Sequence, residues 1–235
     1  MKYFLYLFIF FCVACSTNSK KDSKPIAEPP PFWNDIQNFK KQDSVSFPPK
    51  NAILFIGSSS FTKWTDVQDY FPGYTIINRG FGGSTLLDQI RYEKDIIFTY
   101  QPKQIVIYCG ENDLASSDTV TAQTVFGRFK TLYTDIRNRL PEISIAFISL
   151  KPSPSRRHLF SKMREVNMQI KAFMKFQGDS FLGDPGESNY IDVYQKMLNQ
   201  QGQPMPEIFL DDSLHMNAKG YAIWQKEIQP YLLKD

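Results

Sequence analysis

The sequence predicts an α/β fold, in which helices cover both faces of a central parallel sheet. Five short apolar runs rich in β-branched and aromatic residues recur along the chain, without the polar alternation of a sheet that has one face in water. Stretches of helical periodicity separate these runs, and such alternation implies right-handed crossovers between parallel strands. With 42% hydrophobic and 15% aromatic residues, the chain has enough apolar surface for a core. We therefore expect a three-layer α/β/α sandwich.

The individual elements follow from these two patterns. A short amphipathic helix comes first, because the apolar residues at positions 32, 33, 36 and 39 share one helical face. The predicted strands are residues 52–56, 74–77, 104–109, 144–149 and 190–193. The later predicted helices are residues 86–100, 119–140, 157–176 and 217–233. Ser84 is placed to cap the first of these later helices, and Thr119 to open the second.

Length and charge restrict the class of protein. The chain has 235 residues and no internal repeat, which indicates one folded domain. Its net charge is only +3, and 27 Lys and Arg residues are scattered among 24 acidic ones, so a dedicated nucleic-acid binder is excluded. Three cysteines and two histidines are too few for a disulfide framework or a Cys/His zinc cluster. No metal site is expected.

Residues 1–14 have the pattern of a signal peptide. Lys2 supplies an early positive charge, and an apolar run follows from residue 3 to residue 14. The end of this run, Cys12-Val13-Ala14-Cys15, resembles a bacterial lipobox, in which small residues precede a cysteine that becomes lipidated after cleavage. This resemblance implies that the mature protein begins at a lipidated Cys15, although Cys12 stands where a leucine is usual.

The lipidated cysteine predicts an extracytoplasmic protein that its lipid tethers to a bacterial membrane, in the periplasm or at the cell surface. Residues 15–31 are rich in Ser, Lys, Asn and Pro and are typical of a linker, which leaves residues 32–235 for the folded domain. Two alternatives stay open. One is a membrane-spanning helix, which needs about 20 apolar residues. The other is ordinary secretion with Cys15 as a free thiol.

Polar and glycine-rich segments follow the first three predicted strands. They are residues 57–60, 78–84 and 110–113. Because the carboxyl ends of parallel strands meet at one edge of the sheet, we expect these segments to lie together. A fourth segment, residues 211–215, precedes the last helix and contains a histidine with an acid three residues before it. Together the four segments hold the parts of a serine hydrolase.

A hydroxyl nucleophile needs a neighbouring base, and histidine suits this role because its side chain titrates near neutrality. His215 is the stronger of the two candidates, because His158 follows two arginines at an expected solvated helix start. Asp212 is the expected partner that orients the His215 imidazole, with Asp211 as the fallback.

The tetrahedral intermediate of such a reaction needs preorganised hydrogen-bond donors. The backbone N–H of Ser59, the backbone N–H of Gly83 and the side-chain amide of Asn112 are the expected donors. Gly83 lacks a Cβ and permits close approach of its backbone. These three donors come from three different loops and are predicted to converge on one oxygen.

The four segments resemble the blocks of the SGNH hydrolase family, also called GDSL esterases and lipases, from about residue 52 to the C-terminus. The resemblance implies that Ser59 is the nucleophile. It implies that Gly83 and Asn112 are oxyanion-hole donors, and that Asp212 and His215 complete a triad. A flavodoxin-like sandwich and an esterase activity without a cofactor are also implied.

The first block departs from the family at two positions. It reads Gly-Ser-Ser-Ser, with Ser58 and Ser60 where the family name spells Asp and Leu. The nucleophile position is kept, so the departures concern the subgroup and the local hydrogen bonding. The stretches ILFIGSSSFTKW, NRGFGGS and LKPSPSR most resemble exported lipoproteins of unassigned substrate.

Each segment taken alone has a structural alternative. Gly-Ser-Ser-Ser is also typical of a polar turn, in which Ser58 or Ser60 carries any reactivity. Residues 80–84 resemble a phosphate-binding loop but lack its lysine and its glycine spacing. Asn112 and Asp212 belong to residue types that cap turns and helices. The conjunction of the four segments in this order favours the hydrolase.

Other residues are interpreted as structural and not catalytic. Phe61 rules out the Gly-x-Ser-x-Gly elbow of α/β-hydrolases. Cys109 is expected as a small buried hydrophobe, and Trp64 and Trp224 as core or groove wall. Residues 151–157 are expected as a solvated face, with an entrance for an anionic substrate as the alternative.

The sequence thus predicts a serine esterase that hydrolyses carboxylic esters through an acyl-enzyme. Its expected partners are a small-molecule or glycan ester and, through the lipid anchor, a membrane. Small acyl groups on a glycan are one substrate class, and short-chain or lysophospholipid esters are the other. A non-catalytic glycan-binding lipoprotein on the same scaffold, or an acyltransferase that uses the same acyl-enzyme, is the alternative function.

Overall fold

The structure is a computed structural model that describes residue 1, residues 28–178 and residues 186–234. The chain separates into two units, Met1–Pro30 and Pro31–Asp235, and the fold described below is that of the second. The predicted signal peptide, Cys15 and most of the predicted linker lie outside the described residues. Within the described part of the chain, no helix has the length and apolarity needed to cross a membrane.

Five strands form one parallel sheet in the order β2-β1-β3-β4-β5. Their bounds are β1 Ile53–Gly57, β2 Ile76–Gly80, β3 Gln104–Tyr108, β4 Ser144–Ile148 and β5 Ser188–Ile191. The strand order reverses direction at β1, which lies between β2 and β3. The predicted parallel sheet and the flavodoxin-like order are confirmed. Loops after β1, β2 and β3 therefore share the carboxyl edge at the switch point of the sheet.

The largest error in the predicted strands is at β2. The polar residues Asn78 and Arg79 were expected in a loop, but they continue the strand and pair in register with β1. Asn78 Nδ2 donates to the carbonyl of Phe61 at 2.8 Å, and the Arg79 guanidinium pairs with Asp43. These partners come from distant segments, so the apolar pattern of the strand gave no sign of them.

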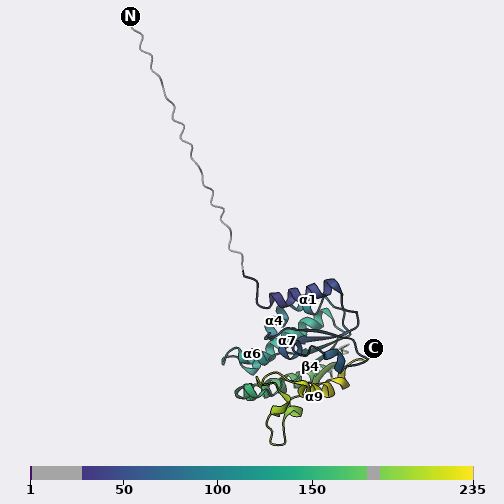
Figure 1. Ribbon diagram of the computed structural model, residues 1–235, viewed down its shortest axis with the longest axis vertical. Helices are drawn as coiled ribbons and strands as arrows, with labels where there is room; N and C mark the ends of the chain where they lie inside the picture. Colours follow the sequence, from purple (N-terminus) through teal and green to yellow (C-terminus); the bar gives the residue numbers. More distant parts are fainter. Residues whose placement is uncertain (2–27, 179–185, 235) are drawn as a thin grey trace. The chain divides into compact units, whose positions relative to one another are not determined.

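Helices cover both faces of the sheet, and Figure 1 shows α1 and α9 on opposite sides of it. The α-helices are α1 Trp33–Val45, α2 Ser59–Thr62, α3 Val67–Tyr70, α4 Leu86–Arg91, α5 Glu93–Ile96, α6 Glu111–Ala115, α7 Ala122–Arg139, α8 Phe160–Gly178 and α9 Ala218–Ile228. The 3-10 helices are η1 Pro154–Leu159, η2 Gln195–Met197, η3 Pro206–Ile208 and η4 Gln229–Tyr231.

Two buried clusters form the core, one on each face of the sheet. Helices α1, α4, α7 and α8 pack on the face that receives Leu54 and Ile56 of β1. Helices α2, α3 and α9 pack on the face that receives Ile53 and Phe55. Because successive strand residues point to opposite faces, a continuous apolar run supplies both cores. The predicted three-layer sandwich is confirmed.

The predicted helices differ from the observed ones mainly at their ends. The helix predicted over 86–100 is interrupted at Tyr92 and forms the two short helices α4 and α5. Thr85, and not Ser84, is the N-cap of α4, and it forms a capping box with Asp88. The short helices α2, α3 and α6 were missed, because four or five residues contain too little periodicity to detect.

Candidate active site

The predicted nucleophile, Ser59, lies at the turn from β1 into α2. This turn depends on Gly57, whose φ of +148° is rarely open to residues with a side chain. A Cβ on Gly57 would also lie 1.9 Å from the carbonyl oxygen of Tyr108. The turn leaves Ser59 partly exposed, whereas Ser58 and Ser60 are 4% and 1% exposed.

The structure brings Ser59, His215 and Asp212 into one chain of hydrogen bonds. His215 Nε2 lies 2.9 Å from Ser59 Oγ, and His215 Nδ1 lies 2.6 Å from Asp212 Oδ2. Among the described residues, Ser59 is the one serine of the cluster that bonds to His215. This geometry disfavours Ser58 and Ser60 as the reactive hydroxyl.

Asp212 is held by its own loop. Its Oδ1 atom accepts hydrogen bonds from the backbone N–H groups of Leu214 and His215, each at 2.9 Å. Partial burial opposes ionisation of Asp212, but the hydrogen bonds from His215 and Leu214 outweigh it and lower the pKa of this carboxyl. Asp212 is therefore a carboxylate at neutral pH. It does not cap the last helix, because Asn217 does.

Helices α2 and α9 position Ser59 against His215. Tyr221 of α9 donates its hydroxyl to the carbonyl of Ser60 at 2.8 Å, and its ring stacks on Trp64 with the centroids 4.7 Å apart. Trp64 and Trp224 are fully buried, so they are core residues and not groove wall. Contacts between residues this far apart in sequence bring the serine to the histidine.

The predicted oxyanion donors lie on three segments at the carboxyl edge: Ser59 begins α2, Gly83 lies in the loop after β2, and Asn112 lies in α6 and not in a loop as expected. Gly83 has a φ of +85°. Asn112 Nδ2 donates to the carbonyl of Ser84, the residue that follows Gly83, at 3.0 Å. In residues 28–178 and 186–234, neither the N–H of Ser59 nor that of Gly83 donates a hydrogen bond. These two N–H groups are available to a ligand at the site.

The aromatic ring of Phe32 lies beside Gly83, a contact that the sequence did not indicate. Phe32 precedes α1 with a φ of 64°, and its ring packs edge-on against Phe81 with the centroids 5.3 Å apart. A Cβ on Gly83 would lie 3.8 Å from the Phe32 ring. The first residues of the folded domain thus form part of the surroundings of the candidate site.

Two buried acids flank Asn112. Asp113 accepts from the backbone N–H of Leu86 at 2.9 Å and from Arg128 at 2.8 Å. Burial raises the pKa of the Asp113 carboxyl despite these bonds. Glu111 bonds to Lys151 at 2.8 Å. Asp113 thus connects the segment after β3 to α4 and α7, and Glu111 connects it to the segment after β4.

The solvated face expected for residues 151–157 is wrong for residues 151–153, which are buried, and the entrance alternative is wrong for Lys151. Lys151 is 2% exposed and pairs with Glu111, so it does not line an entrance. His158 is exposed on η1 and Arg157 bonds to Gln203 Oε1 at 2.5 Å. Arg156, also in this segment, contacts Asn112 directly.

Cys109 is buried at the end of β3, as expected. Burial, followed by the nearby charge of Asp113, raises the pKa of its thiol well above the ordinary value. The thiol is therefore protonated at neutral pH and is not a nucleophile. No group of three or more His, Cys, Asp or Glu side chains in the described part of the chain is arranged to hold a metal ion.

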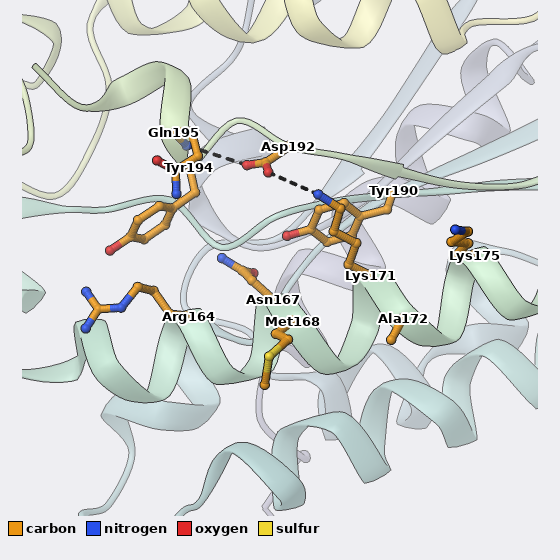
Figure 2. Close-up of a pocket in the computed structure, with 10 residues that line it drawn as sticks. All are labelled: Arg164, Asn167, Met168, Lys171, Ala172, Lys175, Tyr190, Asp192, Tyr194 and Gln195. Atoms are coloured by element: carbon orange, nitrogen blue, oxygen red, sulfur yellow. Dashed lines mark hydrogen bonds and ion pairs between the residues drawn. The ribbon is translucent and has the colours of Figure 1, made fainter. Parts of the chain in front are cut away.

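A separate groove of about 410 Å³ lies between α8 and the end of β5. Figure 2 shows Arg164, Lys171 and Lys175 on the helix side, with Tyr190 and Tyr194 across from them. None of the residues that line this groove is a predicted catalytic residue. The groove and the Ser59 site are therefore formed by different side chains.

The fold and these hydrogen bonds are those expected of a hydrolase that uses a serine nucleophile. Residues 55–223 match the GDSL-like lipase/acylhydrolase family. The chain belongs to this family. The match confirms the predicted family.

Solved structures show the same fold in other proteins. A proposed acylhydrolase from Bacteroides fragilis is 20% identical, with a TM-score of 0.72, and the match covers 87% of this chain and 97% of that one. A GDSL-like lipase from Bacteroides thetaiotaomicron is 19% identical, with a TM-score of 0.69 over 83% and 96% of the two chains. A variant of an acetyl-xylooligosaccharide esterase from Geobacillus stearothermophilus is 13% identical, with a TM-score of 0.58 over 77% and 93%. None of the curated proteins matches the chain.

Proposed function

We propose that the protein is a serine esterase that hydrolyses carboxylic esters through an acyl-enzyme on Ser59. The observation that carries the proposal is the position of His215, whose two ring nitrogens bond to Ser59 and Asp212. A serine hydroxyl is a weak nucleophile until a base takes its proton, and an oriented imidazole is suited to do so.

In the first half of the reaction, Ser59 Oγ attacks the ester carbonyl carbon while its proton passes to His215 Nε2. The tetrahedral intermediate collapses, the bond to the alcohol oxygen breaks, and the alcohol leaves with the proton from His215. In the second half, water attacks the acyl-enzyme and gives a proton to His215. Collapse of the second intermediate releases the carboxylic acid and returns that proton to Ser59. Asp212 keeps the imidazole oriented throughout.

The proposed oxyanion hole consists of the N–H groups of Ser59 and Gly83 and the amide of Asn112. Support comes from the two backbone N–H groups, which have no acceptor within the described residues. Donors that are already in place need no reorganisation when charge develops on the carbonyl oxygen.

The test is hydrolysis of p-nitrophenyl acetate, butyrate and octanoate by the full-length protein. We expect Ser59→Ala to lower kcat by about 10⁴-fold or more. Ser60→Ala is the matched control, because Ser60 is buried beside Ser59 and its hydroxyl has no hydrogen-bond partner in the described residues. A fluorophosphonate should label Ser59 alone, as read by peptide mapping.

A folded protein with neither turnover nor label would instead support the non-catalytic glycan-binding lipoprotein. Release of p-nitrophenol that speeds up on addition of an acceptor alcohol, without more free acid, would support an acyltransferase.

We propose a short acyl group on a glycan or small alcohol as the substrate class. Fold similarity to an acetyl-xylooligosaccharide esterase supports this choice. The ester series sizes the acyl pocket: a preference for acetate supports the proposal, and a preference for octanoate supports lysophospholipid or longer-chain esters.

We also propose that the mature protein is extracytoplasmic and held to a bacterial membrane by a lipid on Cys15. The pattern of residues 1–15 supports this proposal. A surface location agrees with a glycan or lipid ester as substrate, because both occur outside the cytoplasm.

A further inference from the structure

The side-chain amide of Asn112 is bound at both ends. Its Nδ2 atom donates to the carbonyl of Ser84 at 3.0 Å, and its Oδ1 atom accepts from Arg156 Nη2 at 2.9 Å. An amide nitrogen carries two N–H groups, so one remains after the bond to Ser84. The two bonds together fix the plane of the amide and leave its free N–H with one direction.

Arg156 is itself held against the start of α6. Its Nη1 atom donates to the carbonyl of Glu111 at 2.7 Å, and its Nε atom lies 3.7 Å from Glu111 Oε1. The Arg156 side chain is only 16% exposed. Because the planar guanidinium contacts two consecutive residues, it cannot turn away from Asn112 without losing several hydrogen bonds.

The carboxylate that holds Arg156 belongs to a buried cluster. Glu111 also bonds to Lys151 Nζ at 2.8 Å, to the Ser153 hydroxyl at 2.8 Å and to the Tyr108 hydroxyl at 2.6 Å. Burial opposes ionisation of Glu111, but Lys151 and Arg156 outweigh it and lower the pKa of this carboxyl. Lys151 and Arg156 therefore share one buried carboxylate, which holds Arg156 beside Asn112.

The segment that contains Arg156 also contacts the loop of Asp212 and His215. The backbone N–H of Ser155 donates to the carbonyl of Ser213 at 3.0 Å, and the Ser153 hydroxyl lies 3.5 Å from the carbonyl of Leu214. The Lys-Pro-Ser-Pro-Ser-Arg stretch, which ends at Arg156, thus connects α6, which contains Asn112, with the loop of Asp212 and His215.

We propose that Arg156 is a positioning residue of the oxyanion hole, which orients the Asn112 amide and polarises its free N–H toward the developing oxyanion. A charged donor on the amide oxygen strengthens the donors at the other end of the same amide. Arg156 acts through Asn112 and does not touch the substrate. The inference rests on the proposed function of the Ser59 site.

The test is a double-mutant cycle with p-nitrophenyl acetate, in the full-length wild-type protein, Asn112→Ala, Arg156→Gln and the double variant. Removal of the Asn112 donor should lower kcat by about 10²–10³-fold. Arg156→Gln should lower kcat by about 10- to 100-fold with little change in KM, but by less than about 3-fold when Asn112 is already alanine. Arg156→Lys keeps the positive charge but lacks the planar N–H donors of arginine. It should therefore recover part of the lost kcat.

Arg157→Gln is the matched control, because Arg157 is the next residue and its exposed side chain bonds to Gln203. We expect its kcat within about 2-fold of wild type. Equal fold losses from Arg156→Gln in both Asn112 backgrounds would overturn the proposal, and so would an unchanged kcat in the single variant. Circular dichroism checks that each variant is folded, and Arg156→Lys replaces Arg156→Gln if the latter is not.

A second measurement separates this inference from the proposed function. If the wild-type protein has no Ser59-dependent turnover, the esterase proposal fails, and the Asn112 amide is then read directly by NMR. Its side-chain signals are assigned by their absence in Asn112→Ala. Arg156→Gln should shift them and Arg157→Gln should not. Unchanged signals in Arg156→Gln would overturn the positioning role.

Discussion

Single residues at the carboxyl edge of the sheet decide whether the candidate site forms. Gly57 is the clearest case, because its positive φ and the 1.9 Å approach of the Tyr108 carbonyl to a Cβ leave no room for alanine. We expect Gly57→Ala to lower the free energy of unfolding by about 3 kcal/mol or more, as measured by urea denaturation.

Gly127 provides the opposite control. It lies within α7, its φ is ordinary, and a Cβ there meets nothing within 4 Å. Gly127→Ala should raise the free energy of unfolding by about 0.5–1 kcal/mol, because alanine loses less backbone entropy in a helix. Similar effects of the two substitutions would contradict the role given to Gly57.

The ionisation of Glu111 makes the stability of the folded protein depend on pH. Its folded-state pKa lies below the ordinary value of 4.5, so near that pH the unfolded chain binds more protons than the folded protein. The stabilisation is complete above about pH 4.5 and is lost as the pH falls through the folded-state value. Glu111→Gln should therefore flatten the acid side of a stability-against-pH curve.

This variant should also lower the free energy of unfolding at pH 7 by about 3 kcal/mol, because Lys151 stays buried without its carboxylate. Urea midpoints between pH 3 and 7 measure both effects, with the exposed Glu165→Gln as the control. An acid limb as steep as that of the wild type would show that Glu111 is not the linked group.

At the scale of elements, one ion pair attaches α1 to the sheet. Asp43 of α1 pairs with Arg79 of β2, and both side chains are nearly buried, at 10% and 9% exposed. Tyr100 completes the contact, because its hydroxyl accepts from Arg79 Nε at 2.6 Å. Asp43→Asn leaves the buried Arg79 guanidinium without its carboxylate. This substitution should therefore lower the free energy of unfolding by about 3 kcal/mol.

Hydrogen exchange measures this effect locally, and amides of α1 should exchange faster in Asp43→Asn. The exposed pair of Lys40 and Asp95 provides the control, with side chains 50% and 31% exposed. Asp95→Asn should cost less than about 1 kcal/mol. Equal costs for the two substitutions would mean that the buried pair does not attach α1.

The packing of α9 on α2 has a different consequence, because it sets the distance between serine and histidine. Tyr221 bonds to the backbone of Ser60 and stacks on Trp64, so the helix after His215 is attached to the helix that begins with Ser59. Both helices bury their side chains in the same core cluster. The separation of the reacting atoms is therefore a property of this core.

At the scale of the whole molecule, the lipid anchor and the folded domain should act independently. If Cys15 is lipidated, Cys15→Ser should move the protein from the membrane fraction to the soluble fraction of an exporting bacterium, with unchanged ester turnover per molecule. Ser19→Ala, in the predicted linker and outside the lipobox, is the control and should stay in the membrane fraction. Mass spectrometry of the N-terminal peptide reads the modification, and an unmodified Cys15 in the membrane fraction would contradict the anchor.

The arrangement of the whole chain follows from patterns that are local in sequence. Runs such as residues 53–57 and 104–108 are apolar on both faces, which requires a covered parallel sheet, and the helical stretches between them require crossovers. The same topology brings the segments with Ser59, Gly83 and Asn112 to one edge. The sequence by itself therefore determined the fold class, the family and the edge at which the polar segments meet.

Only the tertiary structure decided which polar side chains pair. Asn78 and Arg79 continue a strand because their partners are Phe61 and Asp43, and Lys151 is buried because Glu111 neutralises it. The contact of Arg156 with Asn112 joins segments separated by 44 positions in the chain. Apolar burial leaves a periodic mark on the sequence, whereas a pair of charges or hydrogen-bonding groups leaves none until the fold brings its members together.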